Sequence, residues 1–123
     1  MLTSTKVTGI GYQLDGKTNK YVINKIGKLD RFLPRHARRT ASAEVRIKQR
    51  DGSSGVKYEI EAQIDVPEKM ILAKSSGLHV FTAIDEVESK LAAQLRKYKQ
   101  SQVAHIGRRR ILSRFKRSYA REQ

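Results

Sequence analysis

The chain has 123 residues, of which 38% are hydrophobic, enough for one modest core but not for two ordinary domains. Its 26 Lys and Arg residues against 12 Asp and Glu residues give a formal net charge of +14, which favours nucleic acid or an anionic membrane as a partner. The absence of cysteine excludes disulfides, thiolate catalysis and cysteine-bound metals. No stretch reaches the ~18 apolar residues that a membrane span requires, so we expect a soluble, cytoplasmic protein.

The positive charge is concentrated towards the C-terminal end. Residues 96–123 contain ten basic side chains and one acidic side chain, whereas residues 1–95 contain sixteen basic and eleven acidic ones. We therefore divide the chain into a folded domain, residues 1–101, and a basic tail, residues 102–123. Because like charges repel, we expect the tail to be disordered, or helical only when an anionic partner neutralises it.

The N-terminal part predicts a strand followed by a helix. Residues 2–9 are typical of a short strand, and Asp15 can cap a helix by accepting hydrogen bonds from its first backbone N–H groups. Pro34 marks the expected end of this helix. The apolar stripe of the helix consists of Val22, Ile26, Leu29 and Leu33. A mostly basic stripe on the other side consists of Lys17, Lys20, Asn24, Lys28, Arg31 and Arg35.

The middle of the chain predicts a hairpin. Residues 43–51 and 56–66 alternate between apolar and polar side chains, which is the period of half-buried strands. The Gly- and Ser-rich segment between them predicts a turn, and residues 70–77 supply a third strand. A second helix begins near Val80, with a continuous apolar stripe formed by Val80, Ile84, Val87, Leu91, Leu95 and Tyr98.

The predicted order is β-α-β-β-β-α, an α+β fold. Each helix has one apolar stripe and the sheet has one apolar face, so we expect a four-stranded sheet with both helices packed on one face. This arrangement is similar to that of double-stranded-RNA-binding domains. The open sheet face would carry Glu59, Glu61 and Asp65 among its charges, which predicts a molecule whose helical side is the more positive.

Binding of RNA through its phosphates is the favoured function. Lys and Arg side chains neutralise phosphates and release condensed counterions. Outward aromatic side chains for base stacking are not expected on the sheet, because Tyr58 shares the parity of the buried residues. Core packing is the expected role of the aromatic residues beside the helical stripes, Tyr21, Phe32, Phe81 and Tyr98. We therefore expect recognition of shape and phosphates rather than of base sequence.

Other functions remain as alternatives. A membrane-surface or calmodulin-binding helix would resemble the tail, but would not need a second basic surface on the domain. A hydrolase could use Glu59 and Glu61, although carboxylates on an exposed strand are more typical of cross-strand ion pairs. His36, His79 and His105 lie in separate segments, so we expect no metal ion, no cofactor and no enzymatic activity.

Several motifs resemble the ribosome hibernation-promoting factors and ribosome-associated inhibitors, a family of sigma-54 modulation protein-like sequences. These motifs are VTGIGYQLD, YVINKIGKLDRFLP, the alternating hairpin and FTAIDEVESKLAAQLRKYK, in that order over about residues 5–100. The resemblance implies a domain that binds the small ribosomal subunit in the channel for mRNA and tRNA, near the decoding centre. Such a protein blocks translation and preserves inactive ribosomes under stress. A general double-stranded or structured RNA-binding protein, or RNA chaperone, is the alternative.

The resemblance also implies a set of rRNA-binding residues. In the first helix these are Lys25, Lys28 and Arg31. In the second helix they are Lys90, Arg96, Lys97 and Lys99. The charge of the tail adds Arg108, Arg109 and Arg110. The residues after Ser101 are too few to form the dimerisation domain of long family members, so we expect a short form that is monomeric off the ribosome, with no small-molecule substrate.

Overall fold

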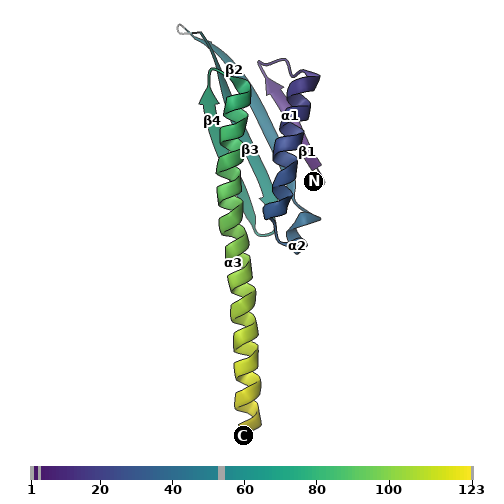
Figure 1. The fold of residues 1–123 in the computed structure, drawn as a ribbon, viewed down its shortest axis with the longest axis vertical. Helices are drawn as coiled ribbons and strands as arrows, with labels where there is room; N and C mark the ends of the chain where they lie inside the picture. The colour runs from purple at the N-terminus through teal and green to yellow at the C-terminus, as the bar shows by residue number, and fades with distance from the viewer. Residues whose placement is uncertain (1, 3, 53–54, 123) are drawn as a thin grey trace.

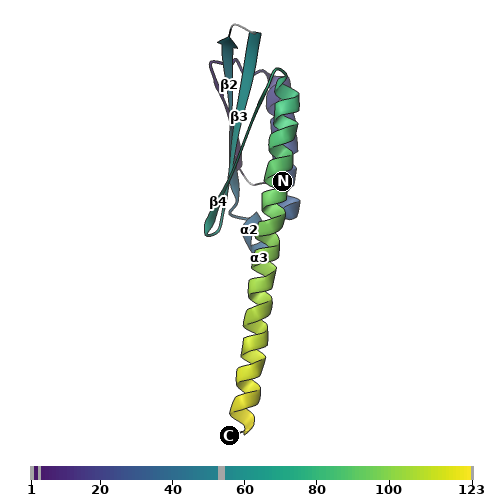
Figure 2. The ribbon, with the colours of Figure 1, turned by 90° about the vertical axis from the view of Figure 1, so that its left-hand side faces the viewer.

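The structure is a computed structural model that describes residue 2, residues 4–52 and residues 55–122, with side chains as far as Gln102. In this part of the chain a four-stranded sheet has the order β1-β2-β3-β4. Strands β1 and β2 are parallel, and the other neighbours are antiparallel. The helices lie along one face of the sheet (Figure 1, Figure 2). The predicted α+β fold and the one-sided packing of its helices are confirmed.

The first half of the chain contains one strand and three helical segments. They are β1 (Ser4–Ile10), α1 (Gly16–Gly27), the 3₁₀ helix η1 (Lys28–Phe32) and the short helix α2 (Arg35–Arg38). The backbone N–H of Thr18 donates to the Asp15 carboxylate at 2.7 Å, so the predicted N-cap is correct. The predicted first helix ends before Pro34, as expected, but its last part is wound as η1 rather than as a continuous α-helix, and a separate short helix, α2, begins after Pro34.

The second half contains β2 (Ser42–Gly52), β3 (Gly55–Val66), β4 (Lys69–Gly77) and α3 (Val80–Glu122). Val45 pairs with Ala62 and Ala62 with Ala73, which places apolar side chains of three strands in register on the helical side. The chain turns from β3 into β4 at Glu68, a residue with a φ of +68°. The predicted strands and their alternation are correct, while residues 53–54 of the predicted turn lie outside the described residues.

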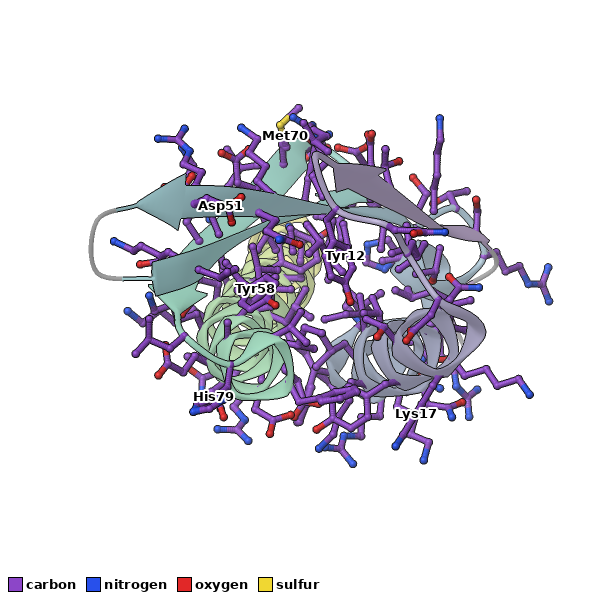
Figure 3. The ribbon with its side chains drawn as sticks, turned by 90° about the horizontal axis from the view of Figure 1, so that it is seen from above. Tyr12, Lys17, Asp51, Tyr58, Met70 and His79 are labelled. Carbon is purple, nitrogen blue, oxygen red and sulfur yellow. The ribbon has the colours of Figure 1, made fainter. Side chains whose placement is uncertain are left out.

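The apolar stripes of α1 and α3 meet the sheet in a single core. Val22, Ile26, Leu29 and Leu33 are buried on one side, and Ile84, Val87, Leu91, Leu95 and Tyr98 on the other. Tyr12 and Tyr58 fill the end of this layer with rings in edge-to-face contact, 5.8 Å between centroids (Figure 3). Both predicted stripes therefore form the core, although Val80 is only partly buried.

The helix α3 continues beyond the sheet as far as Glu122 (Figure 1). It therefore includes the backbone of the segment that we predicted as a tail. The domain boundary at residue 101 stays a prediction, because the side chains beyond Gln102 are not described.

Replacement of Leu95 by alanine tests the docking of α3 on the sheet. Leu95 is fully buried, so Leu95→Ala should lower the free energy of unfolding by about 2–5 kcal/mol through lost burial and a residual cavity. Urea denaturation followed by circular dichroism measures this change. Ser89→Ala, at an exposed position of the same helix, should change stability by no more than about 0.5 kcal/mol. Equal stability of the two variants would contradict this packing.

Candidate nucleic-acid interface

A groove of about 370 Å³ lies between the first helical segments and α3. We call it the helix seam. Its lining combines four polar or basic side chains from α1 and η1 with an aromatic ring and an acidic residue: Asn24, Lys25, Lys28, Arg31, Tyr21 and Glu88. The basic stripe predicted for one helix is divided among three segments, and all of its residues are solvent-exposed: Lys17, Lys20 and Asn24 on α1, Lys28 and Arg31 on η1, and Arg35 on α2. The helix seam therefore lies beside a surface from which many cations can reach an anionic partner.

One end of the helix seam is neutralised by acidic residues. The Lys25 ammonium lies 3.7 Å from the Asp85 carboxylate and 3.8 Å from the Glu88 carboxylate. The Tyr21 hydroxyl donates to Asp85 at 2.5 Å. This hydrogen bond raises the pKa of Tyr21 to about 12, with smaller contributions from partial burial and from the charges of Asp85 and Glu88. At this end the single lysine is shared between two carboxylates, so no net positive charge remains.

At and beside the opposite end of the helix seam lie three cations that have no ion-pair partner among the described side chains. Among the side chains that the structure describes, no carboxylate forms an ion pair with Lys28, Arg31 or Arg96, which we call the basic cluster. The guanidinium carbons of Arg31 and Arg96 lie 4.7 Å and 4.8 Å from the centroid of the Phe32 ring. Both distances are within the range of cation–π interaction. Residues from η1 and α3 are thus brought together on one aromatic ring.

The predicted rRNA-binding residues of α3 divide between two sides of the helix. Arg96 reaches Phe32 of η1, and Lys99 follows it by three residues, which places both on the same side. Lys90 instead donates to the backbone carbonyl of Lys74 on β4 at 2.7 Å. Lys97 follows Lys90 by seven residues and shares its side. The structure therefore brings Lys28, Arg31 and Arg96 together but separates Lys90 and Lys97 from them.

Side chains of α3 also cover the free edge of β4. Besides Lys90, Gln94 donates to the Leu72 carbonyl at 2.7 Å, and the Tyr98 hydroxyl donates to the Pro67 carbonyl at 3.1 Å. Lys90 and Gln94 thus occupy carbonyls that this edge strand would otherwise offer to another chain, while Tyr98 binds the turn that precedes β4. The close spacing of Lys90, Gln94 and Tyr98, four residues apart, thus has a structural purpose that the sequence motif did not reveal.

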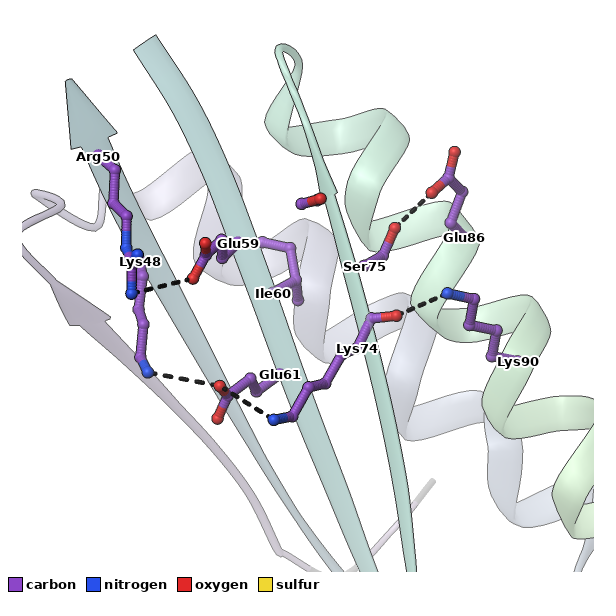
Figure 4. Close-up of a pocket in the computed structure, with 10 residues that line it drawn as sticks. Lys48, Arg50, Glu59, Ile60, Glu61, Lys74, Ser75, Glu86 and Lys90 are labelled. Atoms are coloured by element: carbon purple, nitrogen blue, oxygen red, sulfur yellow. Dashed lines mark hydrogen bonds and ion pairs between the residues drawn. The ribbon is translucent and has the colours of Figure 1, made fainter. Parts of the chain in front are cut away.

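The open face of the sheet is an ion-paired surface. Glu61 lies 3.4 Å from Lys48, 3.7 Å from Lys74 and 3.8 Å from Arg46, in a groove that Figure 4 shows with Lys90 beside it. Partial burial raises the pKa of Glu61, but the three cations outweigh it and the pKa is lowered overall. Because basic side chains neutralise the Glu61 carboxylate, the open face is less negative than its acidic residues alone would suggest. The difference in charge between the open face and the helical face is therefore smaller than we predicted.

The carboxylates considered for a hydrolase belong to this ladder of ion pairs. Glu59 lies 3.5 Å from Arg50, and Glu61 has the three cations just described. Each carboxylate is thus held in a cross-strand ion pair, the arrangement that the alternation of the strands indicated. In the described part of the chain, no group of three or more His, Asp or Glu side chains could hold a metal ion. No described helix has the length and apolarity of a membrane span.

Arg108, Arg109 and Arg110 lie outside the described side chains, and their predicted role stays a prediction. Sequence reasoning missed three other residues in or beside the helix seam. Phe32 was assigned to core packing, yet its half-buried ring also supports two guanidinium groups. Asp85 and Glu88 were not considered, although an acidic pair three residues apart on a helix that faces a lysine stripe was a visible signal.

The class of protein that follows from this geometry is a small α+β domain with a cationic helical face. Residues 5–103 match the family described as Sigma 54 modulation protein / S30EA ribosomal protein, and the chain belongs to this ribosome-associated family. The resemblance found in the sequence is therefore confirmed. No curated protein sequence gives a significant match.

Several solved structures share the fold, including the following two. The Thermus thermophilus Protein Y N-terminal domain has a TM-score of 0.64 and 20% sequence identity. A ribosomal subunit interface protein from Coxiella burnetii has a TM-score of 0.65 and 21% identity. Each comparison covers 80% of this chain and 99% of the other chain. At this identity the similarity establishes the architecture of the domain.

Substitution of Glu61 tests the ion pairs of the open face. Because the folded state lowers the pKa of Glu61, its carboxylate stabilises the protein above the unfolded-state pKa, and this contribution is lost as the pH falls through the folded-state pKa. Glu61→Gln should therefore be less stable than the wild type at pH 7. The difference in urea midpoint should shrink on acidification towards pH 3. A difference that stayed constant with pH would show that the charge of Glu61 does not contribute.

Proposed function

We propose that this protein is a ribosome hibernation factor. In this proposal it binds rRNA of the small ribosomal subunit in the mRNA and tRNA channel near the decoding centre, blocks translation and preserves inactive ribosomes. It acts as a monomer without cofactor or catalysis, in the cytoplasm and under stress. Lys25, Lys28, Arg31, Lys90, Arg96, Lys97 and Lys99 are the proposed contacts on the domain, with Arg108, Arg109 and Arg110 on the tail.

The single observation that carries the proposal is the basic cluster. Lys28, Arg31 and Arg96 come from η1 and α3, yet they lie on one side of the domain and have no carboxylate partner among the described side chains. Unpaired cations of this kind neutralise phosphates without first breaking an ion pair. Membership of a ribosome-associated family supports rRNA as the polyanion in this proposal.

The alternative is a general binding protein for double-stranded or structured RNA. The same basic cluster would fit the phosphates of any RNA helix, since shape and charge carry no sequence information. The two functions differ in affinity. A ribosome-specific protein binds small subunits more tightly than an unrelated RNA duplex, whereas a general RNA-binding protein or chaperone binds both equally.

Cosedimentation with purified small ribosomal subunits tests the proposal. The wild type should move with the subunits at low salt and dissociate as salt rises, because each phosphate contact adds about 0.7–0.9 to the slope of log affinity against log salt. Reversal of the basic cluster, Lys28→Glu with Arg31→Glu and Arg96→Glu, should abolish binding through lost attraction and new repulsion. Translation assays in a cell-free extract should show parallel loss of inhibition.

A matched variant controls for net charge. Lys6→Glu, Lys57→Glu and Lys69→Glu change the total charge by the same amount at exposed positions away from the basic cluster. This variant should still cosediment and inhibit translation. Equal loss of binding in both triple variants would show that only the overall charge matters. Wild-type protein that stayed at the top of the gradient at low salt would contradict the proposal.

Truncation of the tail tests its share of the affinity. Removal of residues 102–123 deletes a run of basic side chains, so binding to small subunits should weaken and its salt dependence should become less steep. The truncated protein should still unfold cooperatively in urea, and its circular dichroism spectrum should still show a folded α+β domain. An unchanged affinity would assign all of the binding to the domain.

A further inference from the structure

We propose that Phe32, Arg31 and Arg96 form one phosphate-binding unit, in which the Phe32 ring holds two guanidinium groups ready to bind the backbone of an RNA strand. The proposal rests on the function proposed above and names Phe32, an apolar residue, as a positioning residue for RNA binding. The first step of the argument is geometric. Arg31 comes from η1 and Arg96 from α3, and their guanidinium carbons lie 4.7 Å and 4.8 Å from the same ring centroid.

The ring itself is fixed by its neighbours. Phe32 is the last residue of η1, is half-buried and packs against the core, and the residue that follows it, Leu33, is fully buried. The Arg38 side chain donates to the Leu33 carbonyl at 3.1 Å, which ties the short helix α2 to the end of η1. Because the ring cannot swing away freely, the two exposed guanidinium groups that contact it lose little further freedom on binding.

The chemistry of the two cations suits a phosphate. A guanidinium group presents N–H donors in a planar fork that matches two phosphate oxygens, and it stacks on an aromatic face with its donors still directed outward. Both guanidinium carbons lie within 5 Å of one centroid, so they are no more than about 10 Å apart. Two guanidinium groups within this distance can bind one phosphate together, or two neighbouring phosphates of one strand.

The contrast with Lys25 shows why this end of the helix seam is selected. Lys25 also lies near an aromatic ring, 5.7 Å from the centroid of Tyr21, but it has Asp85 and Glu88 as ion-pair partners. An incoming phosphate there meets two carboxylates. At Phe32 the ring supports the cations without neutralising them. The Phe32 ring therefore holds cations in place at one end, as the carboxylates do at the other. Unlike the carboxylates, the ring leaves the positive charge available to a phosphate.

Conservative variants test the unit while keeping every charge. Phe32→Leu removes the aromatic face, and Arg31→Lys with Arg96→Lys removes the planar forks. Each should weaken binding to RNA on the order of tenfold. Phe32→Tyr keeps the ring and should bind like the wild type. Phe81→Leu is the matched control, because Phe81 is also half-buried but packs edge-to-face on Tyr21 at 4.6 Å, away from both arginines. It should change affinity less than twofold.

Combination of the variants separates positioning from a merely structural role. If Phe32 acts through the arginines, the double lysine change should cost much less affinity in the Phe32→Leu background than in the wild type. Additive effects, or wild-type affinity of Phe32→Leu, would overturn the proposal. Urea denaturation shows whether Phe32→Leu is folded. Should it unfold, wild-type affinity of the double lysine variant overturns the proposal and a tenfold loss supports it.

Two RNA probes keep this test distinct from the test of function. Affinities are measured for purified small ribosomal subunits and for an unrelated RNA duplex of about 16 base pairs, the span that a double-stranded-RNA-binding domain covers. Equal affinity of the wild type for both probes contradicts the ribosomal function, but the comparison of variants on the duplex still tests the unit. Tighter binding to subunits with no effect of the variants contradicts the unit alone.

Discussion

The docking of α3 on the sheet is the constraint on which the rest of the surface depends. Leu91 and Leu95 are fully buried, and the helical period then fixes the direction of every other side chain of α3. Glu88 and Arg96 are directed towards α1 and η1, while Gln94 reaches the edge of β4. Rotation of α3 would expose these leucines, at about 1.5–3 kcal/mol for each side chain. The arrangement of charges is thus a consequence of core packing.

The cations behind the net charge of +14 are therefore not equally available to bind a polyanion. On the open sheet face, Glu61 is surrounded by three cations, and in the helix seam Lys25 is shared by two carboxylates. Exposed ion pairs of this kind add little to stability, about 0–1 kcal/mol each, but they cancel the local potential. Among the described side chains, Arg31 and Arg96 are two cations without a carboxylate partner that meet on one aromatic ring, so their charge stays available to a polyanion.

Much of the fold could be predicted from the sequence because burial imposes a period. The alternation of residues 56–66 and the stripe from Ile84 to Tyr98 each identified an element and its buried face. Partners of exposed side chains follow no such period, since they depend on which elements become neighbours. The pairing of Lys25 with Asp85 joins residues 60 positions apart, and the contact of Lys90 with β4 needs the edge position of that strand. The helix and strand periods alone identify neither contact, because both depend on which elements become neighbours.

The change from α1 to η1 shows how a local departure from the helical period shapes the site. An α-helix turns about 100° per residue and a 3₁₀ helix about 120°, so over the five residues of η1 the difference accumulates to roughly 100°. A continuous α-helix, as the sequence predicted, would direct Phe32 away from its observed position by about that angle. Leu29 and Leu33 are nonetheless both buried, because Leu33 follows the end of η1 in an extended conformation, so its direction is not set by the winding of η1. The core thus tolerates the tighter winding, and the direction of Phe32 towards Arg96 depends on it.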